Sequence, residues 1–496
     1  MNLMPAPELP AGIEWFNTDH PLSIQELAGR IVLLYFGTFA CSNCMRLMPD
    51  LRRLMEEHPE VVVIGVHAPG FESAPAAGNL REAISRAGIR YPVAIDHDRL
   101  LWQAFGVRSW PTFALIDPGG NILGKMAGEG FYSRLSPKID RVRDDFEARG
   151  TLTRERFQPV ADPSPALYFP GKIAADHAGM RLFISDTGHN RIIVTGRDGE
   201  IQQVIGTGAP GSADGPSREA TFYLPEGLTF DESAGILYVA DTGNHTIRRI
   251  SWPDLAVETV AGTGLEAASP GGGGPGKSVA LSKPRDLALM GDHLYIAMAG
   301  ANQIWRMDLF THTLEPYAGS GLEGLVDGPL RKAAFARPSG IVTDGEALYV
   351  ADSGASAIRR IKRGMVETRI GHSPEDLGDL DTIARMARIN HPAGIAIHQG
   401  LIYIADTGNH KVKEFDPDTG WVLTRIGSGE RGYRNGVSGD ARLNGPGGLV
   451  NLGGYWYIAD TGNHAIRVYD PIEHVVLDLV LQQHAAIRHP LPEIPQ

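Results

Sequence analysis

The chain has 496 residues, which exceeds the roughly 250 to 300 residues that one hydrophobic core spans, so we expect more than one domain. Its formal net charge of −12 argues against broad binding of nucleic acid or anionic membranes. It contains only two cysteines, which excludes a framework of structural disulfides and favours a reducing compartment. No apolar run reaches membrane-spanning length and Met1–Leu22 lacks the pattern of a secretory signal, so we expect a cytoplasmic protein that contacts no membrane.

From Ile24 to about Gly150 the sequence predicts alternating strands and helices. The expected strands are Ile31–Phe36, Val61–Val66, Tyr91–Ile95, Phe113–Ile116 and Asn121–Met126. The expected helices are Cys44–His58, Asn79–Ala87, Leu100–Phe105 and Tyr132–Ala148. Crossovers of this kind predict an α/β domain with helices on both faces of a central sheet.

Both cysteines lie in the stretch Tyr35–Leu51, at the turn between the first strand and the first helix. Cys41 falls near the helix start and Cys44 falls three residues later, within the first turn. There the unpaired N–H groups and the helix dipole favour negative charge, so a thiolate at Cys41 is stabilised and its pKa lowered. The placement predicts a reversible disulfide.

The pattern resembles the thioredoxin fold, and Trp110-Pro111-Thr112 before the strand Phe113–Ile116 agrees with it, since thioredoxin-like proteins carry a cis-proline facing the active-site cysteine at this place. The resemblance implies that Pro111 lies beside Cys41 and takes part in catalysis with both cysteines. It further implies that Trp110, Thr112 and Phe39 position the substrate. The additional element between the second and third strands resembles the insertion of the peroxiredoxin-like and cytochrome-maturation branches.

Three residues depart from thioredoxins proper and put the rate of catalysis in question. Tyr35 stands six residues before Cys41, where thioredoxins usually hold a buried carboxylate that helps to deprotonate the second cysteine. Asn43 replaces the usual proline and Ala40 the usual tryptophan.

Other interpretations of the cysteines stay open. Zinc is disfavoured because there is no second CxxC and the finger-like pair His484 and His489 lies 440 positions or more from Cys44. We therefore expect neither metal nor other cofactor. The cysteines could instead be small core residues. His67, at the end of a strand, is interpreted as a structural histidine in preference to a catalytic base.

Residues 151–166 are polar, carry Pro159, Pro163 and Pro165, and predict a linker between a domain at 1–150 and a second domain at 167–484, with a tail at 485–496. The second domain is an internal repeat. Its six units are Leu182–Asn190, Leu237–His245, Leu294–Asn302, Leu348–Gly354, Ile402–His410 and Trp456–His464. The repeated Asp, replaced once by Met298, recurs every 54 to 57 residues.

Pro-x-Gly-like starts precede these units at Pro225, Pro338, Pro392 and Pro446, and each unit has room for four strands. The pattern resembles NHL repeats and predicts an all-β six-bladed propeller.

The repeated Asp-Thr-Gly is most simply six copies of one turn, because Asp and Thr bond backbone N–H groups locally and Gly permits positive φ. Basic residues follow each turn and could line an RNA-binding surface, which the acidic balance disfavours. They are Arg191, Arg248, Arg306, Arg359, Lys411 and Arg467.

In an up-and-down blade, the Asp-Thr-Gly turns share a face with the links between blades. These links are long, about twenty residues each: Ile205–Leu224, Ala261–Lys283, Ala318–Arg337, Ile370–His391 and Ile426–Asn444. Long loops are often functional, so this face is a candidate surface for a protein partner or for the first domain. An equally favoured alternative is that the links form ordered Asp-Gly turns and bind no ligand.

The two modules together resemble the family of NHL repeat-containing protein 2 and its bacterial relatives, on the motif Cys41–Leu51 with its Cys-x-Asn-Cys, followed by NHL repeats. The resemblance implies a thiol–disulfide oxidoreductase whose propeller holds a protein substrate or partner. The main alternative is a non-catalytic interaction scaffold with a vestigial or regulatory cysteine pair. A lactonase-like propeller site is a weaker alternative, because no inward-facing carboxylates can be located by pattern.

Overall fold

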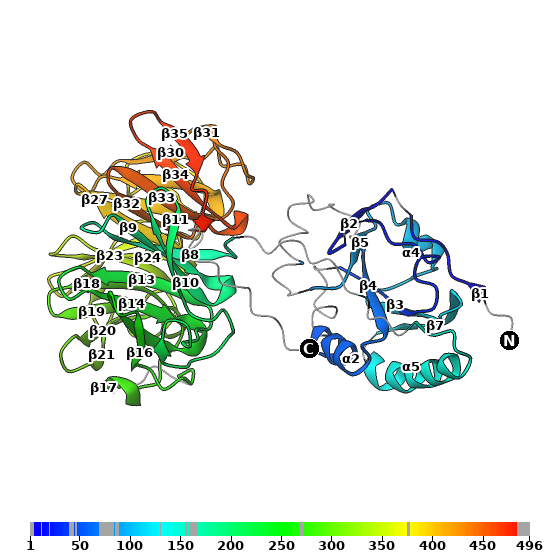
Figure 1. Ribbon diagram of the computed structural model, residues 1–496. Helices are drawn as coiled ribbons and strands as arrows, with labels where there is room; N and C mark the ends of the chain where they lie inside the picture. The colour runs from blue at the N-terminus through cyan, green and yellow to red at the C-terminus, as the bar shows by residue number, and fades with distance from the viewer. Residues whose placement is uncertain are drawn as a thin grey trace. The chain divides into compact units, whose positions relative to one another are not determined.

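The computed structural model divides into two compact units, residues 1–164 and 165–496 (Figure 1). It describes residues 4–10, 12–18, 20–38, 44, 47–68, 84, 89–128, 130–153, 157, 166–267, 272–373 and 377–483. Each unit has hydrophobic clusters of its own. Among the helices in these parts of the chain, none is both long and apolar enough to cross a membrane.

A seven-stranded sheet forms the centre of the first unit, in the order β1-β7-β6-β3-β4-β5-β2. The strands are β1 (Met4–Pro5), β2 (Glu14–Phe16), β3 (Ile31–Gly37), β4 (Val61–His67), β5 (Val93–Ile95), β6 (Thr112–Ile116) and β7 (Asn121–Ala127). β3, β4 and β5 run parallel to one another, whereas β6 is antiparallel to both of its neighbours, β3 and β7. Every residue of β3 and β4 is buried because both faces of the sheet are covered.

Helices cover both faces, as predicted. On one face, α2 (Met48–Glu57) and α5 (Phe131–Ala148) bury their apolar stripes, including Leu51, Leu54 and Phe131. On the other face lies α4 (Leu100–Ala104), which buries Leu101. The thioredoxin-like α/β class expected for this unit is confirmed.

The predicted helix Cys44–His58 is interrupted near its start. Cys44 is helical, but Leu47 lies in a turn and α2 begins only at Met48, with Pro49 in its first turn. Proline has no N–H to donate to the preceding turn and its ring fits the first turn of a helix, so it marks a new beginning. The predicted helix Asn79–Ala87 lies outside the described residues except for Ile84.

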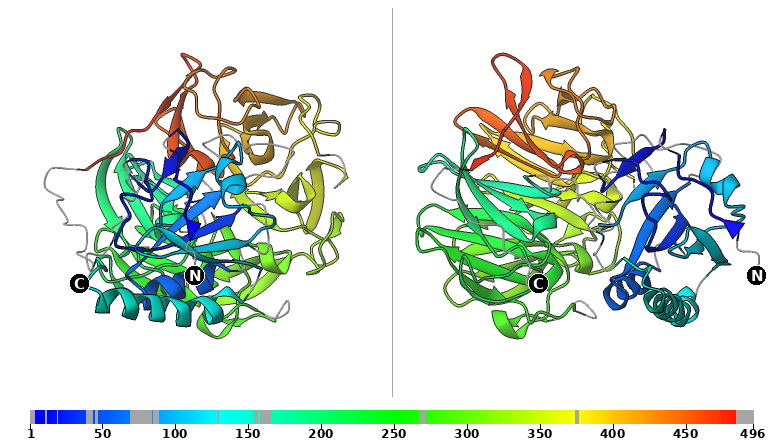
Figure 2. Two further views of the ribbon diagram at one scale, coloured as in Figure 1. Left: turned by 90° about the vertical axis from the view of Figure 1, so that its right-hand side faces the viewer. Right: turned by 45° about the vertical axis from the view of Figure 1, so that its right-hand side comes forward.

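The second unit is a six-bladed β-propeller, as predicted, and Figure 2 shows its blades succeeding one another around the ring. Each blade has four antiparallel strands. From inner to outer edge, blade 1 has β8 (Pro170–Asp176), β9 (Arg181–Asp186), β10 (Arg191–Gly196) and β11 (Glu200–Ile205), and blade 2 has β13 (Pro225–Asp231), β14 (Ile236–Asp241), β15 (Thr246–Ser251) and β16 (Ala256–Ala261). Blade 3 has β18 (Pro284–Met290), β19 (His293–Met298), β20 (Gln303–Asp308) and β21 (Thr313–Ala318), and blade 4 has β23 (Pro338–Thr343), β24 (Leu348–Asp352), β25 (Ala357–Lys362) and β26 (Met365–Ile370). Blade 5 has β27 (Gly394–His398), β28 (Leu401–Asp406), β29 (Lys411–Phe415) and β30 (Val422–Ile426), and blade 6 has β32 (Gly448–Leu452), β33 (Tyr455–Asp460), β34 (Ala465–Asp470) and β35 (Val475–Asp478).

The inner strands close a ring, because each contacts the next and β32 contacts β8. Five blades also carry a fifth, two-residue strand on the outer edge that the sequence did not predict. Four of these belong to the links that enter blades 2, 3, 4 and 6: β12 (Gly215–Pro216), β17 (Gly274–Pro275), β22 (Gly328–Pro329) and β31 (Gly436–Val437). The fifth, β36 (Gln482–Gln483), returns from the end of blade 6 and pairs with β11 of blade 1.

Short 3-10 helices form the turn between the second and third strand of every blade. They are η1 (Thr187–His189), η2 (Thr242–Asn244), η4 (Ala299–Ala301), η5 (Ser353–Ala355), η6 (Thr407–Asn409) and η7 (Thr461–Asn463), while η3 (Gly276–Ser278) lies in a link. The repeated Asp-Thr-Gly is therefore one turn copied around the ring, as expected.

Candidate functional site

Cys44 lies at the end of the first unit where the parallel strands β3 and β4 finish. Its side chain is buried, with 2% exposed, and belongs to the core cluster beneath α2. Its thiol is free. Cys41 and Phe39 lie outside the described residues. Their assignment as attacking thiol and substrate contact therefore stays a prediction.

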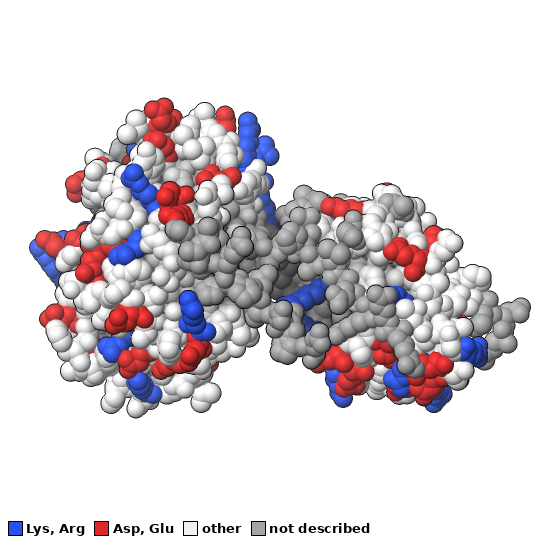
Figure 3. Space-filling model, viewed as in Figure 1, with Lys and Arg blue, Asp and Glu red and all other residues white. Residues whose placement is uncertain are grey.

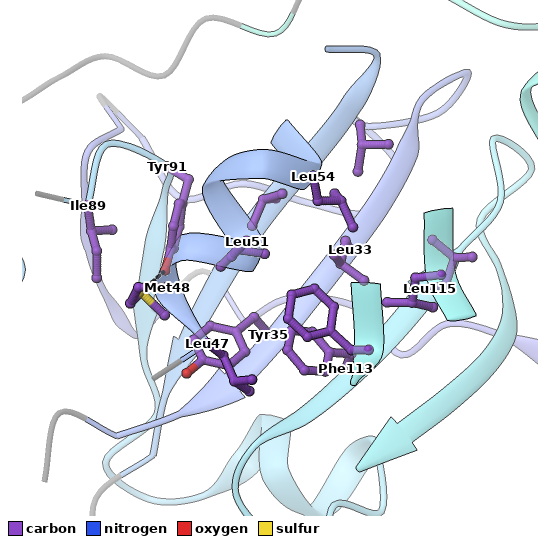
Figure 4. Close-up of a cluster of buried hydrophobic side chains, with 14 of the residues drawn as sticks. Leu33, Tyr35, Leu47, Met48, Leu51, Leu54, Ile89, Tyr91, Phe113 and Leu115 are labelled. Carbon is purple, nitrogen blue, oxygen red and sulfur yellow. Dashed lines mark hydrogen bonds between the residues drawn. The ribbon is translucent and has the colours of Figure 1, made fainter. Parts of the chain in front are cut away.

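Tyr35 occupies the place of the usual thioredoxin carboxylate and acts on the backbone of Cys44. Its hydroxyl donates to the Cys44 carbonyl oxygen at 3.2 Å. Its ring stacks on Phe113, with centroids 5.1 Å apart, and Phe113 stacks in turn on Phe131. Figure 4 shows Tyr35 between Phe113 and the start of α2. The tyrosine thus holds the helical turn of Cys44 by a neutral hydrogen bond where a carboxylate would supply charge.

The peptide bond between Trp110 and Pro111 is cis, as the thioredoxin resemblance led us to expect. β6 begins at the next residue, and Thr112 pairs with Phe36 near the end of β3. Pro111 therefore reaches the same edge of the sheet as Cys44. The Pro111 carbonyl accepts the N–H of Gly128 at 3.0 Å.

The residues on either side of Pro111, Trp110 and Thr112, make contacts inside the first unit. The buried hydroxyl of Thr112 donates to the Ser109 carbonyl at 2.7 Å and so braces the proline turn. Trp110 packs against Trp102, with ring centroids 5.3 Å apart, and beneath the guanidinium of Arg99. Substrate contact by Trp110 or Thr112 stays a prediction.

A small cavity of about 20 Å³ adjoins Cys44. Room of this size holds about one water molecule. The described residues that line it come from β3, β4 and β5, from α2 and from the segments next to these elements: Tyr35, Gly37, Thr38, Cys44, Met48, Gly65, Val66, His67, Ile89, Tyr91 and Val93. His67 was interpreted from sequence as structural, and the structure brings it to the wall of the cavity that Cys44 shares.

In the propeller, the Asp of each repeated turn is a buried brace. One carboxylate oxygen accepts a backbone N–H from the segment that enters the same blade, in the pairs Asp186–Tyr168, Asp241–Tyr223, Asp352–Ala336, Asp406–Asn390 and Asp460–Asn444, at 2.6 to 2.8 Å. Burial raises the pKa of Asp241 and of Asp352 to about 6, and these hydrogen bonds oppose the rise.

Two further positions of the turn fasten each blade to the next. The Thr hydroxyl donates to the first proline carbonyl of the following blade in the pairs Thr187–Pro225, Thr242–Pro284, Thr407–Pro446 and Thr461–Pro170, at 2.6 to 2.7 Å. The residue after the turn has positive φ, and its side chain accepts a backbone N–H of the next blade in all six copies: Asn190–Leu224, His245–Lys283, Asn302–Arg337, Ser356–His391, His410–Gly445 and His464–Phe169, at 2.9 to 3.2 Å. The hydrogen bonds of the repeated turn therefore join adjacent blades and help to close the ring.

The basic residues after the turns all pair with acidic side chains. Arg248, Arg359 and Arg467 are fully buried and bond the turn carboxylates of their own blades at 2.8 to 3.0 Å. The side chains of Arg191, Arg306 and Lys411 pair with Asp186, Glu315 and Asp379. On the face drawn in Figure 3, Lys and Arg are interspersed with Asp and Glu. Three of these basic residues are thus buried braces, and the other three pair with neighbouring carboxylates.

The axis of the propeller holds a channel of about 760 Å³, lined by the inner strands of all six blades. Lys172 of blade 1 lies 3.6 Å from the Asp286 carboxylate of blade 3 and donates to the Ala393 carbonyl of blade 5. A side chain that contacts three alternate blades lies at the axis, so it constricts the channel at the face of the Asp-Thr-Gly turns.

The sequence contains a signal for this constriction of the channel by Lys172. Four blades place glycine two residues after the first proline, at Gly227, Gly340, Gly394 and Gly448, where an added Cβ would lie within 3.0 Å of the adjacent blade. Lys172 and Asp286 hold this position in blades 1 and 3. Burial lowers the pKa of Lys172 and raises that of Asp286, and their attraction opposes both shifts.

Comparisons with known proteins agree with this architecture. Residues 29–122 match a thioredoxin-like family, and residues 222–250 and 390–415 match the NHL repeat. NHL repeat-containing protein 2 of Bos taurus is 37% identical over 94% of this chain and 70% of its own length. SUPPRESSOR OF QUENCHING 1 of Arabidopsis thaliana is 34% identical over 98% of this chain and 48% of its own length.

The first unit also has relatives that consist of little else. Thiol-disulfide oxidoreductase YkuV of Bacillus subtilis is 26% identical over 29% of this chain and 97% of its own length. The thioredoxin-like unit is thus related to thiol–disulfide oxidoreductases. The chain as a whole belongs to the family of NHL repeat-containing protein 2, with a thioredoxin-like unit followed by a six-bladed NHL propeller.

Proposed function

We propose that the protein is a thiol–disulfide oxidoreductase whose propeller binds the protein substrate. The observation that carries the proposal is the position of Cys44, buried at the end of β3 and β4 on the sheet edge that the cis-peptide at Pro111 also reaches. The relationship of the unit to thiol–disulfide oxidoreductases supports it.

The reaction has two exchange steps. The Cys41 thiolate attacks a substrate disulfide, forms a mixed disulfide and releases one substrate sulfur as a thiolate, which takes a proton from solvent. Cys44 then loses its proton and attacks the Cys41 sulfur. The second substrate sulfur leaves, so the substrate is reduced by two electrons and the two cysteines are oxidised to a disulfide. Tyr35 positions Cys44 by its hydrogen bond to the Cys44 carbonyl.

The test is capture of the mixed disulfide. In Cys44→Ser the first step proceeds and the second cannot, so the full chain should accumulate substrate linked to Cys41 that dithiothreitol releases. Cys41→Ser should capture nothing and should not reduce insulin, whereas the wild type should. If Cys44→Ser captures no more than Cys41→Ser and the wild type leaves insulin oxidised, the scaffold alternative replaces the enzyme.

A specific observation supports partner binding by the propeller. The links at the face of the Asp-Thr-Gly turns expose apolar side chains, of which Leu265 and Leu322 occupy equivalent positions and are 72% and 73% exposed. Exposed apolar surface can serve as a protein-interaction site, so these two leucines are the residues to test.

The capture experiment extends to this surface. We expect the double change Leu265→Ser and Leu322→Ser, introduced into Cys44→Ser, to lower the yield of captured protein at least five-fold without affecting capture of a small disulfide. Phe310→Ser is the matched control, since Phe310 is 81% exposed in the turn between β20 and β21, at the opposite end of the blade. Equal loss with both changes, or no loss, would remove this surface from the proposal.

A further inference from the structure

The alternation of side chains along β4 places His67 on the same face of the sheet as Cys44. Val61 and Val63 belong to the core cluster that contains Cys44, whereas Val62 and Val66 belong to the cluster on the opposite face. Since successive side chains of a strand point to opposite faces, His67 follows Val61 and Val63 toward the Cys44 side. Its backbone pairs with Gly37 at the end of β3.

Two glycines create the space that the histidine and the thiol share. Gly37 lies beside His67 on the adjacent strand, and Gly65 lies two residues before it on the same face. A Cβ would lie 2.8 Å from the Tyr35 hydroxyl at Gly37 and 2.9 Å from the Tyr91 ring at Gly65. The tyrosine rings thus occupy the room that side chains would fill, and the cavity of about 20 Å³ remains between them.

Among the described residues that face this cavity, the imidazole is the group that can act as a base. Among the described lining residues, the titratable ones are Cys44, His67, Tyr35 and Tyr91, and no carboxylate is present. Burial raises the pKa of Tyr91, so it stays a neutral phenol. Burial, and secondarily His97, lower the pKa of His67 to about 4, so near pH 7 the imidazole is neutral and has an unprotonated ring nitrogen. The same burial disfavours the imidazolium, so a proton that His67 accepts is held only until the leaving sulfur or solvent takes it.

We propose that His67 accepts the proton of Cys44 during resolution of the mixed disulfide and so replaces the missing carboxylate of thioredoxins. This rests on the proposed function. The S–H bond of Cys44 breaks, its proton passes to a ring nitrogen of His67 directly or through one water, and the sulfur attacks Cys41. The imidazolium returns the proton to the departing substrate sulfur or to solvent. A positioned base typically contributes 10²–10⁴-fold.

The two steps are separated by reaction of the reduced full-length protein with 5,5′-dithiobis(2-nitrobenzoate) in a stopped-flow instrument. The first coloured thiolate reports attack by Cys41, and the second reports attack by Cys44. We expect His67→Gln to leave the first phase within about two-fold and to slow the second about 10²-fold at pH 7. Tyr91→Phe lines the same cavity and should change neither phase.

The pH profile distinguishes proton transfer from packing. The second phase of the wild type should be level between about pH 5.5 and 8, because neutral His67 is present throughout. In His67→Gln it should rise about ten-fold per pH unit, because only thiolate already formed can attack. Equal second phases in the wild type and His67→Gln, or equal slowing by Tyr91→Phe, would refute the assignment. A wild type that releases no second thiolate would instead refute the proposed function itself.

Discussion

At the scale of single residues, β15 offers two adjacent arginines in opposite environments. Arg248 is fully buried and bonds Asp241, whereas Arg249 lies at the surface and pairs with Glu258. We expect Arg248→Met to lower the free energy of unfolding of the propeller by about 3–5 kcal/mol, since it leaves a buried carboxylate without its counter-charge. The control Arg249→Met should cost no more than about 1 kcal/mol. Urea unfolding measures both, and similar losses would contradict the assignment of Arg248 as a buried brace.

A second residue-scale prediction concerns the histidines that fasten blades together. The Nδ1 atom of His410 accepts the Gly445 N–H, and burial lowers the pKa of His410 below 6.5, with Arg431 adding to the effect. The unfolded chain therefore binds a proton at higher pH than the folded chain, so the contribution of His410 to stability is present above pH 6.5 and is lost as the pH falls toward the folded pKa.

Asn302 makes the same bond without titrating, which suggests the matched change His410→Asn. We expect the melting temperature of the variant, relative to the wild type, to increase as the pH is lowered from 8 to 5. The effect should stay below about 1 kcal/mol because His410 is partly exposed and its charge is screened. Calorimetry across this pH range is the measurement, and a difference that does not change with pH would contradict the hydrogen-bond assignment.

At the scale of elements, periodic patterns predicted strands and helices well where a single periodicity holds. The apolar run of β3 and the six repeated turns are examples, because burial on one or both faces imposes the pattern directly. Two-residue strands such as β12 and β36 carry no periodicity and were missed. The interruption at Leu47, just before α2, was missed because the apolar spacing continues through Pro49, whereas proline has no N–H to donate to the preceding turn.

The candidate site was predictable only in part, since its members come from separate elements. The cysteine motif and Pro111 are local patterns, and the sequence identifies them. That His67 faces the Cys44 side of the sheet depends instead on how side chains alternate along β4 and on the glycines at 37 and 65. Likewise the pairing of Lys172 with Asp286 across the propeller axis joins residues more than one hundred positions apart. Such contacts follow from how strands meet, which no single segment reveals.

At the scale of the whole molecule, the chain consists of two units with separate hydrophobic cores. The thioredoxin-like unit buries Cys44 where β3 and β4 end, and the propeller is a ring closed by its turns, by β32 against β8 and by β36 against β11. Chemistry in the first unit and partner selection in the second is the division that we propose, and it requires the cysteine pair to cycle.

The direct measurement is the thiol count of the wild-type chain equilibrated in glutathione buffers, then acid-quenched, alkylated and weighed by mass spectrometry. A cycling pair predicts one two-electron transition from two thiols to none within single chains, with a midpoint between about −120 and −270 mV, the span of thioredoxin-like enzymes. Two thiols that persist through all of these buffers, or disulfides that form only between chains, would contradict the central claim.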